Sequence, residues 1–182
     1  MSNLRLFKKA ITSNIVIAGG PSANEQLSAM VSGEYWTVLN TSILLTCVND
    51  KDLCHRVNAL KHALQTYGPE SIHLPDLRPN KGKAQGFIFH GHANNSNGTT
   101  YILEWTVVDR KKKIMAITAF DTHENFKFRQ EPLSAIEITK ILSLSENIKI
   151  IENVSNKIQE AKEKVERFEA NYKNDKKNSY IS

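Results

Sequence analysis

The fold is decided by residues 87–129, which read FIFHGHANNSNGTTYILEWTVVDRKKKIMAITAFDTHENFKFR. Three runs rich in β-branched and aromatic residues (87–92, 101–109 and 114–121) are separated by a polar loop and a cationic turn, as in antiparallel strands. Alternation gives one apolar face with partners across the hairpin: Tyr101, Leu103, Trp105 and Val107 against Met115, Ile117 and Ala119. The other face is more polar and carries Glu104, Thr106 and Thr118 beside Val108 and Ile114. The pattern predicts a β-meander packed on helices by one face, with residues 126–129 as a fourth strand.

Helix signals lie on the N-terminal side of this meander. Ser22 and Glu25 form a capping box, and the helix they begin is expected to run to Val31 and to stop at Gly33. Asp50 is the expected N-cap of a second helix, which Gly68 ends and whose apolar face carries Leu53, Val57, Leu60, Leu64 and Tyr67. The other segments are predicted as a basic helical turn at 4–10, a strand at 15–18, a hairpin over 35–48 broken at 40–42, and a surface connection over 69–86, mobile at 80–82.

The C-terminal part is predicted to be helical from Pro132 onward. Apolar residues recur at alternating spacings of three and four, as in a heptad repeat: Ile151, Val154, Ile158, Ala161, Val165, Phe168 and Tyr172. Such a helix lies on its own domain, folds back as a hairpin or self-associates. We therefore divide the chain into an α+β domain (1–143), a long amphipathic helix (144–172) that belongs to this domain or forms a partner-binding arm, and a disordered basic tail (173–182).

Composition narrows the class of protein. The chain has 182 residues and a net charge of +5, which suits one domain and favours acidic partners. It lacks an apolar run long enough for a signal peptide or a membrane span, so the cytoplasm is the default location and export without a signal remains open. No cofactor motif is present, and no cofactor is expected.

A thiol site is the first catalytic hypothesis. Cys54 falls near the start of the helix capped by Asp50, where unpaired backbone N–H groups lower the pKa of a thiol. A histidine, His90 or His92, and then Asp121 or Asn125 follow in the chain. This order resembles that of papain-like cysteine hydrolases, a resemblance of residue order over about 70 residues that implies thiol hydrolysis. Cys47 is expected to be an inert core thiol in a strand.

Histidine chemistry on a phosphodiester is the second hypothesis. The meander carries His90 and His92, which point the same way on one strand, and His123 follows it. Metal-independent ribonucleases need a base, an acid and a cation for the charge that develops on the phosphate. Small meander sheets of colicin and toxin ribonucleases are built from such residues. The same histidines with Asp121 also offer metal ligands, but their spacing matches no standard signature, and no metal site is predicted.

A binding surface is the third hypothesis, and it is given first place as the function of the chain. Cations that form one predicted patch lie in two parts of the sequence: Arg110, Lys111, Lys112 and Lys113 in the turn, and Lys81, Lys83, Lys127 and Arg129 around the meander. Aromatic residues are not interleaved among them, so a protein partner is favoured over nucleic acid. The leading prediction is a non-enzymatic regulator or effector-like protein, with a cysteine hydrolase and a metal-independent ribonuclease as alternatives. Whether the chain is an enzyme stays open.

Overall fold

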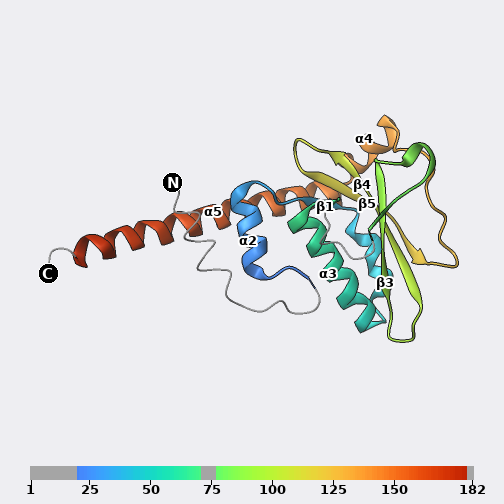
Figure 1. Ribbon diagram of the computed structural model, residues 1–182. Helices are drawn as coiled ribbons and strands as arrows, with labels where there is room; N and C mark the ends of the chain where they lie inside the picture. Colours follow the sequence, from blue (N-terminus) through green and yellow to red (C-terminus); the bar gives the residue numbers. More distant parts are fainter. Residues whose placement is uncertain (1–19, 71–76, 180–182) are drawn as a thin grey trace.

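The computed structural model in Figure 1 describes residues 20–70 and 77–179. The helical turn predicted at 4–10 and the strand predicted at 15–18 lie outside these residues. The prediction of an α+β fold with a small sheet packed on helices and a long C-terminal helix is confirmed.

The sheet has five strands in the order β1-β5-β4-β3-β2. Strands β3 to β5 form the antiparallel meander that the alternation predicted. Strand β2, in the segment expected to be a surface connection, pairs antiparallel with β3, while β1 pairs parallel with β5. The strands are β1 (Thr37–Leu39), β2 (Arg78–Pro79), β3 (Ile88–Asn94), β4 (Thr100–Asp109) and β5 (Ile114–Thr122).

One face of the sheet packs on α3 (Lys51–Tyr67). Asp50 caps this helix as predicted, by accepting a hydrogen bond from the backbone N–H of Leu53 at 3.0 Å. The predicted apolar residues of the helix and of the sheet meet in the main core, whose members include Leu53, Val57, Leu60, Leu64, Phe89, Leu103, Trp105, Met115 and Ile117. This burial of apolar surface is the main source of stability for the domain.

The other face of the sheet is covered over β1 and β5 by the C-terminal helices, α4 (Ala135–Ser143) and α5 (Ser145–Ser179). Asn147 of α5 is fully buried, and its side-chain amide donates to Asn40 Oδ1 at 2.7 Å, at the end of β1. Further along α5, Val154 packs against Ala29 of α2 (Ala23–Ser32), which begins at the predicted capping box and ends at Gly33. The first half of α5 therefore belongs to the domain.

Three local predictions are corrected. Residues 41–47 form a 3-10 helix, η1 (Thr41–Cys47), in place of the second arm of a hairpin. This is because β1 pairs with the distant β5 and Asn40 turns the chain away with a positive φ of 57°. A β-bulge places Ala119 opposite Glu104, so Phe120 takes the core position predicted for Ala119. Residues 126–129 form no strand.

The end of the chain also differs from the expectation. Helix α5 continues to Ser179, so residues 173–179 are helical where composition predicted a disordered tail. In Figure 1 the second half of α5 extends well beyond α2 and the sheet. None of the helices in the described ranges has both the length and the apolarity that crossing a membrane requires.

Candidate functional site

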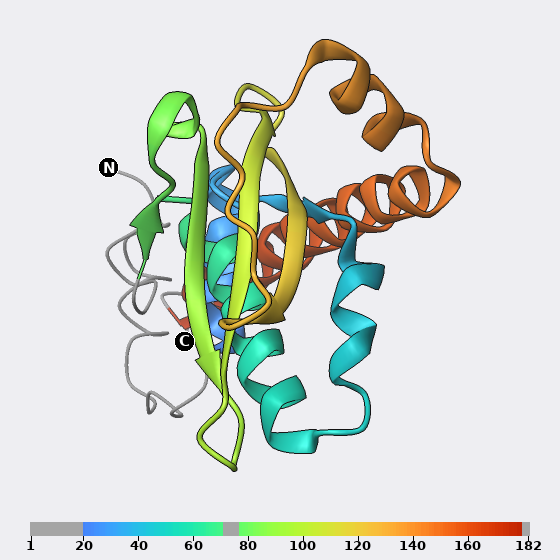
Figure 2. The same cartoon turned by 90° about the vertical axis from the view of Figure 1, so that its right-hand side faces the viewer.

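The site lies on the face of the sheet opposite α3, over β3 and β4. Figure 2 shows that none of the helices among the described residues covers this part of the sheet, and that the segment between β5 and α4 (residues 123–134, the crossing segment) passes in front of it. Gly91 separates the two histidines of β3, and a Cβ at this glycine would lie 3.3 Å from the ring of Trp105 and 3.5 Å from Leu60 of α3. Since neighbouring residues of a strand point to opposite faces, His90 and His92 point away from α3.

A buried carboxylate anchors the crossing segment to the sheet. Glu104 is 2% exposed and lies in the middle of β4. It accepts hydrogen bonds from Asn80 Nδ2 at 2.6 Å, from Thr118 Oγ1 at 2.6 Å and from the backbone N–H of Arg129 at 3.2 Å. The carboxylate therefore joins the segment after β2, strand β5 and the crossing segment at one point.

Asn80 links this carboxylate to His90. Its Nδ2 donates to Glu104 and also to the backbone oxygen of Arg129 at 3.0 Å, so the orientation of the amide is fixed by two acceptors. Asn80 Oδ1 then lies 2.8 Å from His90 Nδ1, which must be the donor because an amide oxygen only accepts. In the neutral ring this tautomer leaves Nε2 without a proton and able to accept one.

The surroundings of His90 favour its neutral form. The pKa of His90 is lowered to about 4, chiefly by burial; the neighbouring His92, Arg78 and His123 add to the decrease, and the charge of Glu104 opposes it. At neutral pH the ring is therefore an uncharged hydrogen-bond acceptor at Nε2. The phenyl ring of Phe128, from the crossing segment, packs on it with ring centroids 4.7 Å apart.

The structure brings the three predicted histidines together. The ring centroids of His90 and His92 are 5.6 Å apart in an edge-to-face arrangement. The rings of His92 and His123 are 6.1 Å apart and nearly parallel. His123 is exposed in the turn after β5, where its backbone N–H donates to Thr100 O at 2.8 Å. Two nitrogen-bearing rings that face each other across a short gap are suited to proton transfer to and from one substrate group.

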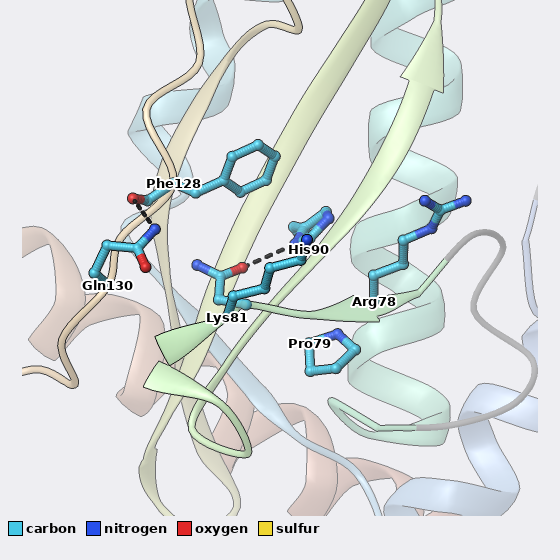
Figure 3. A pocket seen from close by; sticks show the side chains of 7 residues that line it. Arg78, Pro79, Lys81, His90, Phe128 and Gln130 are labelled. Atoms are coloured by element: carbon cyan, nitrogen blue, oxygen red, sulfur yellow. Dashed lines mark hydrogen bonds between the residues drawn. The ribbon is translucent and has the colours of Figure 1, made fainter. Parts of the chain in front are cut away.

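A pocket adjoins the histidines at the β2 edge of the sheet. It has a volume of about 270 Å³ and is lined by Arg78, Pro79, Asn80, Lys81, His90, Phe128 and Gln130. Figure 3 shows that β2 and the turn after it supply one wall, the crossing segment supplies another, and His90 lies between them. Asn80 is 2% exposed at this point, so the mobility predicted for residues 80–82 is corrected at Asn80.

The predicted thiol site is not assembled. Cys54 forms a disulfide with Cys47, which lies in η1 and not in a strand. Cys54 also packs with the core on the α3 side of the sheet, whereas His90 and His92 are on the other side. Asp121 is exposed at the end of β5 in register with Ile102 and His92, and its Oδ1 accepts from the backbone N–H of Thr122 at 2.7 Å.

The predicted cationic residues are spread over separate surface contacts. Lys83 pairs with Glu131, Arg110 with Glu70, Lys113 with Glu34 and Arg129 with Glu137. Lys81 lines the pocket, while Lys111, Lys112 and Lys127 are exposed. Exposed ion pairs of this kind contribute little to stability. In the described part of the chain no group of three or more His, Cys, Asp or Glu side chains is arranged to hold a metal ion.

Sequence reasoning did not find Asn80, Glu104, Phe128 and Gln130 as members of the site. One available signal was Glu104, an acidic residue in the middle of an apolar strand, which has to be satisfied by partners when buried. A second was Phe128, which lies between Lys127 and Arg129 and corrects the expectation that no aromatic residue is interleaved among the cations. Comparisons add no further guidance, because the chain matches no protein family and resembles no curated protein or solved structure at a significant level.

Proposed function

We propose that the open face of the sheet binds single-stranded RNA and cleaves it without a metal ion. The observation that carries this proposal is the convergence of His90, His92 and His123 on the sheet face opposite α3, with the cations Arg78 and Lys81 in the pocket beside His90. Of the three sequence hypotheses, this is the one whose residues lie together. A phosphodiester is the substrate that uses all of them, since it needs proton transfer and a counter-charge at the same place.

The reaction follows from these groups. One ring of the His92 and His123 pair accepts the proton of a ribose 2′-hydroxyl, and the oxygen forms a new bond to phosphorus. The bond from phosphorus to the 5′-oxygen breaks, and the other ring, in its protonated form, donates a proton to that oxygen. The products are a 2′,3′-cyclic phosphate and a free 5′-hydroxyl. Arg78 and Lys81 supply positive charge for the phosphate oxygens.

His90 has a supporting role in this scheme. Its neutral ring, held by Asn80, adds no positive charge beside His92. The need for a 2′-hydroxyl restricts the substrate to RNA. A site built on the face of a sheet, with Phe128 beside it, suits an unpaired strand better than a duplex, whose bases are stacked inside.

A cleavage assay tests this proposal. Labelled single-stranded RNA is incubated with the protein in excess EDTA, and products are separated on a gel. We expect His92→Ala and His123→Ala each to lower the rate by roughly 100-fold or more, as for loss of a general acid or base. His55→Ala is the matched control, because His55 is exposed on α3 and should leave the rate unchanged. Absence of cleavage by the unmodified protein across varied sequences would reject the enzymatic function.

Partner binding is the second candidate function, and the length of α5 favours it. The helix extends beyond the domain in Figure 1, and its distal half carries the half-exposed Phe168 and Tyr172, which are 55% and 46% exposed. A partner or a second copy that packs along this stripe would continue the heptad spacing. Sedimentation of the full chain and of Tyr172→Glu tests this: a dimer that the substitution dissociates supports self-association, and a monomer in both cases removes it.

The location of the protein is a related proposal. Cytoplasmic synthesis is the default, but disulfides are rare in the cytosol, and Cys47 and Cys54 are paired. We therefore propose a working environment that is oxidising. Thiol alkylation of the protein in intact cells and in the medium, read by mass spectrometry, distinguishes the two locations.

A further inference from the structure

The pocket at the β2 edge has a shape and a composition that the cleavage reaction itself does not require. The reacting groups, His92 and His123, lie along the sheet from it, and of its lining residues only His90, Arg78 and Lys81 have a part in the proposed reaction. Its other lining residues therefore need a separate explanation.

The pocket is held in shape by the hydrogen bonds between its two walls. The backbone N–H of Ala84 donates to Gln130 O at 2.9 Å, and Asn80 Nδ2 donates to Arg129 O at 3.0 Å. Glu104 is bonded to both walls from beneath, through Asn80 and the backbone of Arg129. Because these contacts fix both walls, binding in the pocket would cost little reorganisation.

The lining residues point to a planar heteroaromatic group attached to an anion. The phenyl ring of Phe128 and the ring of Pro79 offer apolar surface, and the amide of Gln130 offers one donor and one acceptor at the edge. Arg78 and Lys81 add positive charge at the exposed side. A nucleobase stacked on an aromatic ring, with its phosphate near cations, is the usual form of single-strand recognition.

We infer that this pocket binds one base of the RNA, that of the nucleotide next to the phosphate held at His92 and His123. The inference rests on the proposed function, which it extends from cleavage to base selection. Phe128 supplies the stacking surface, while Gln130 reads the edge of the base. His90 lines the pocket and its ring lies 5.6 Å from that of His92, so in this arrangement the base and the reacting phosphate belong to neighbouring positions of the strand.

Binding of mononucleotides tests this inference independently of cleavage. The four nucleoside 3′-monophosphates and inorganic phosphate are titrated into isotopically labelled full-length protein, and the shifts of the Phe128 and Gln130 resonances are followed. We expect at least one nucleotide to bind and to move both resonances, and to bind at least tenfold more tightly than phosphate. Equal affinity for phosphate and for every nucleotide would overturn the base-binding site.

Two substitutions separate this inference from the proposed function. Phe128→Leu should weaken nucleotide binding by roughly tenfold, the scale expected for stacking one base on an aromatic ring. Gln130→Ala should change the order of preference among the four bases. Phe87→Leu is the control, because Phe87 is 58% exposed and lies outside the pocket. Thermal unfolding of each variant establishes that it is folded.

The outcomes are distinct. If the nucleotides bind in the pocket but RNA is not cut, the base site stands and the catalytic proposal fails. If RNA is cut and the Phe128 and Gln130 variants keep the affinity and the base preference of the unmodified protein, the base site fails and catalysis stands. A non-nucleotide aromatic carboxylate that binds more tightly than every nucleotide would also overturn the assignment.

Discussion

The protonation of His90 gives the most quantitative prediction. Its pKa of about 4 in the folded protein compares with an ordinary value near 6.5, chiefly because the ring is buried. The unfolded chain therefore takes up a proton at a higher pH than the folded protein does. The stabilising effect is fully present above pH 6.5 and is lost as pH falls through the interval down to about 4. This interval corresponds to roughly 3 kcal/mol of unfolding free energy at most.

Urea unfolding between pH 4 and pH 7.5 measures this effect. The comparison is with His90→Gln, whose amide can still donate to Asn80 Oδ1 but does not titrate. We expect the unmodified protein to lose more stability than the variant over this interval, by up to about 3 kcal/mol. His62, whose pKa is also lowered by burial, titrates in both proteins, so its contribution cancels in the difference.

Nuclear magnetic resonance of the ring nitrogens provides the direct readout. The geometry predicts that His90 is neutral at pH 6, with the proton on Nδ1 and none on Nε2. A titration midpoint of His90 at pH 6 to 7, or a proton on its Nε2, would refute the inference that Glu104 and Asn80 hold His90 in this neutral tautomer.

Three further predictions concern stability and the two faces of the sheet. Glu104→Ala should lower the unfolding free energy by roughly 3 kcal/mol or more in urea, because it leaves buried donors unpaired; an effect as small as that of Thr106→Ser would contradict this. Gly91→Val should lower the unfolding free energy by about 1–3 kcal/mol, because the added side chain overlaps Trp105. An unchanged unfolding free energy would mean that Gly91 does not face α3. Replacing both Cys47 and Cys54 with serine should lower the unfolding free energy by about 2 kcal/mol, as expected when the disulfide closes only a short loop. The rate of RNA cleavage should stay unchanged. Loss of cleavage in that folded variant would return attention to a thiol mechanism.

Local signals predicted much of the fold. The capping box at Ser22, the N-cap at Asp50 and the apolar face of α3 depend on residues three to four apart, and they form as predicted. Alternation likewise placed Leu103 and Trp105 on the core face of β4. In each case, the interaction that fixes the structure lies within one element or between adjacent strands.

The failures have a common cause in contacts between distant parts of the chain. The β-branched residues of 41–47 favoured a strand, but the partner of β1 is β5, more than 70 residues away, and a parallel pair leaves no place for a hairpin. Asn80 lies among prolines and glycines, as in a mobile loop, yet it is buried by Glu104 and the segment after β5. The bulge that displaced Ala119 also has no signature in the local sequence.

The candidate site shows the same division. Because His90 and His92 are two residues apart on one strand, the sequence alone predicted that they share a face of the sheet. The turn after β5 brings His123 beside them. The residues that set the tautomer of His90 and the shape of the pocket come from three segments whose meeting only the folded chain reveals. Conversely, the order of Cys54, His92 and Asp121 in the sequence did not bring them together, because the sheet lies between the thiol and the histidines.

The most direct test of the central claim is the chemistry of the RNA ends. A defined single-stranded RNA is treated with the protein in EDTA, and the products are identified by mass spectrometry, alongside the same RNA with 2′-deoxyribose at the cleavage position. The histidine site predicts a 2′,3′-cyclic phosphate and a 5′-hydroxyl from the ribose substrate, no cut in the deoxy substrate, and loss of the reaction in His92→Ala and His123→Ala. Intact RNA after prolonged incubation, or equal cleavage by these variants, would contradict it.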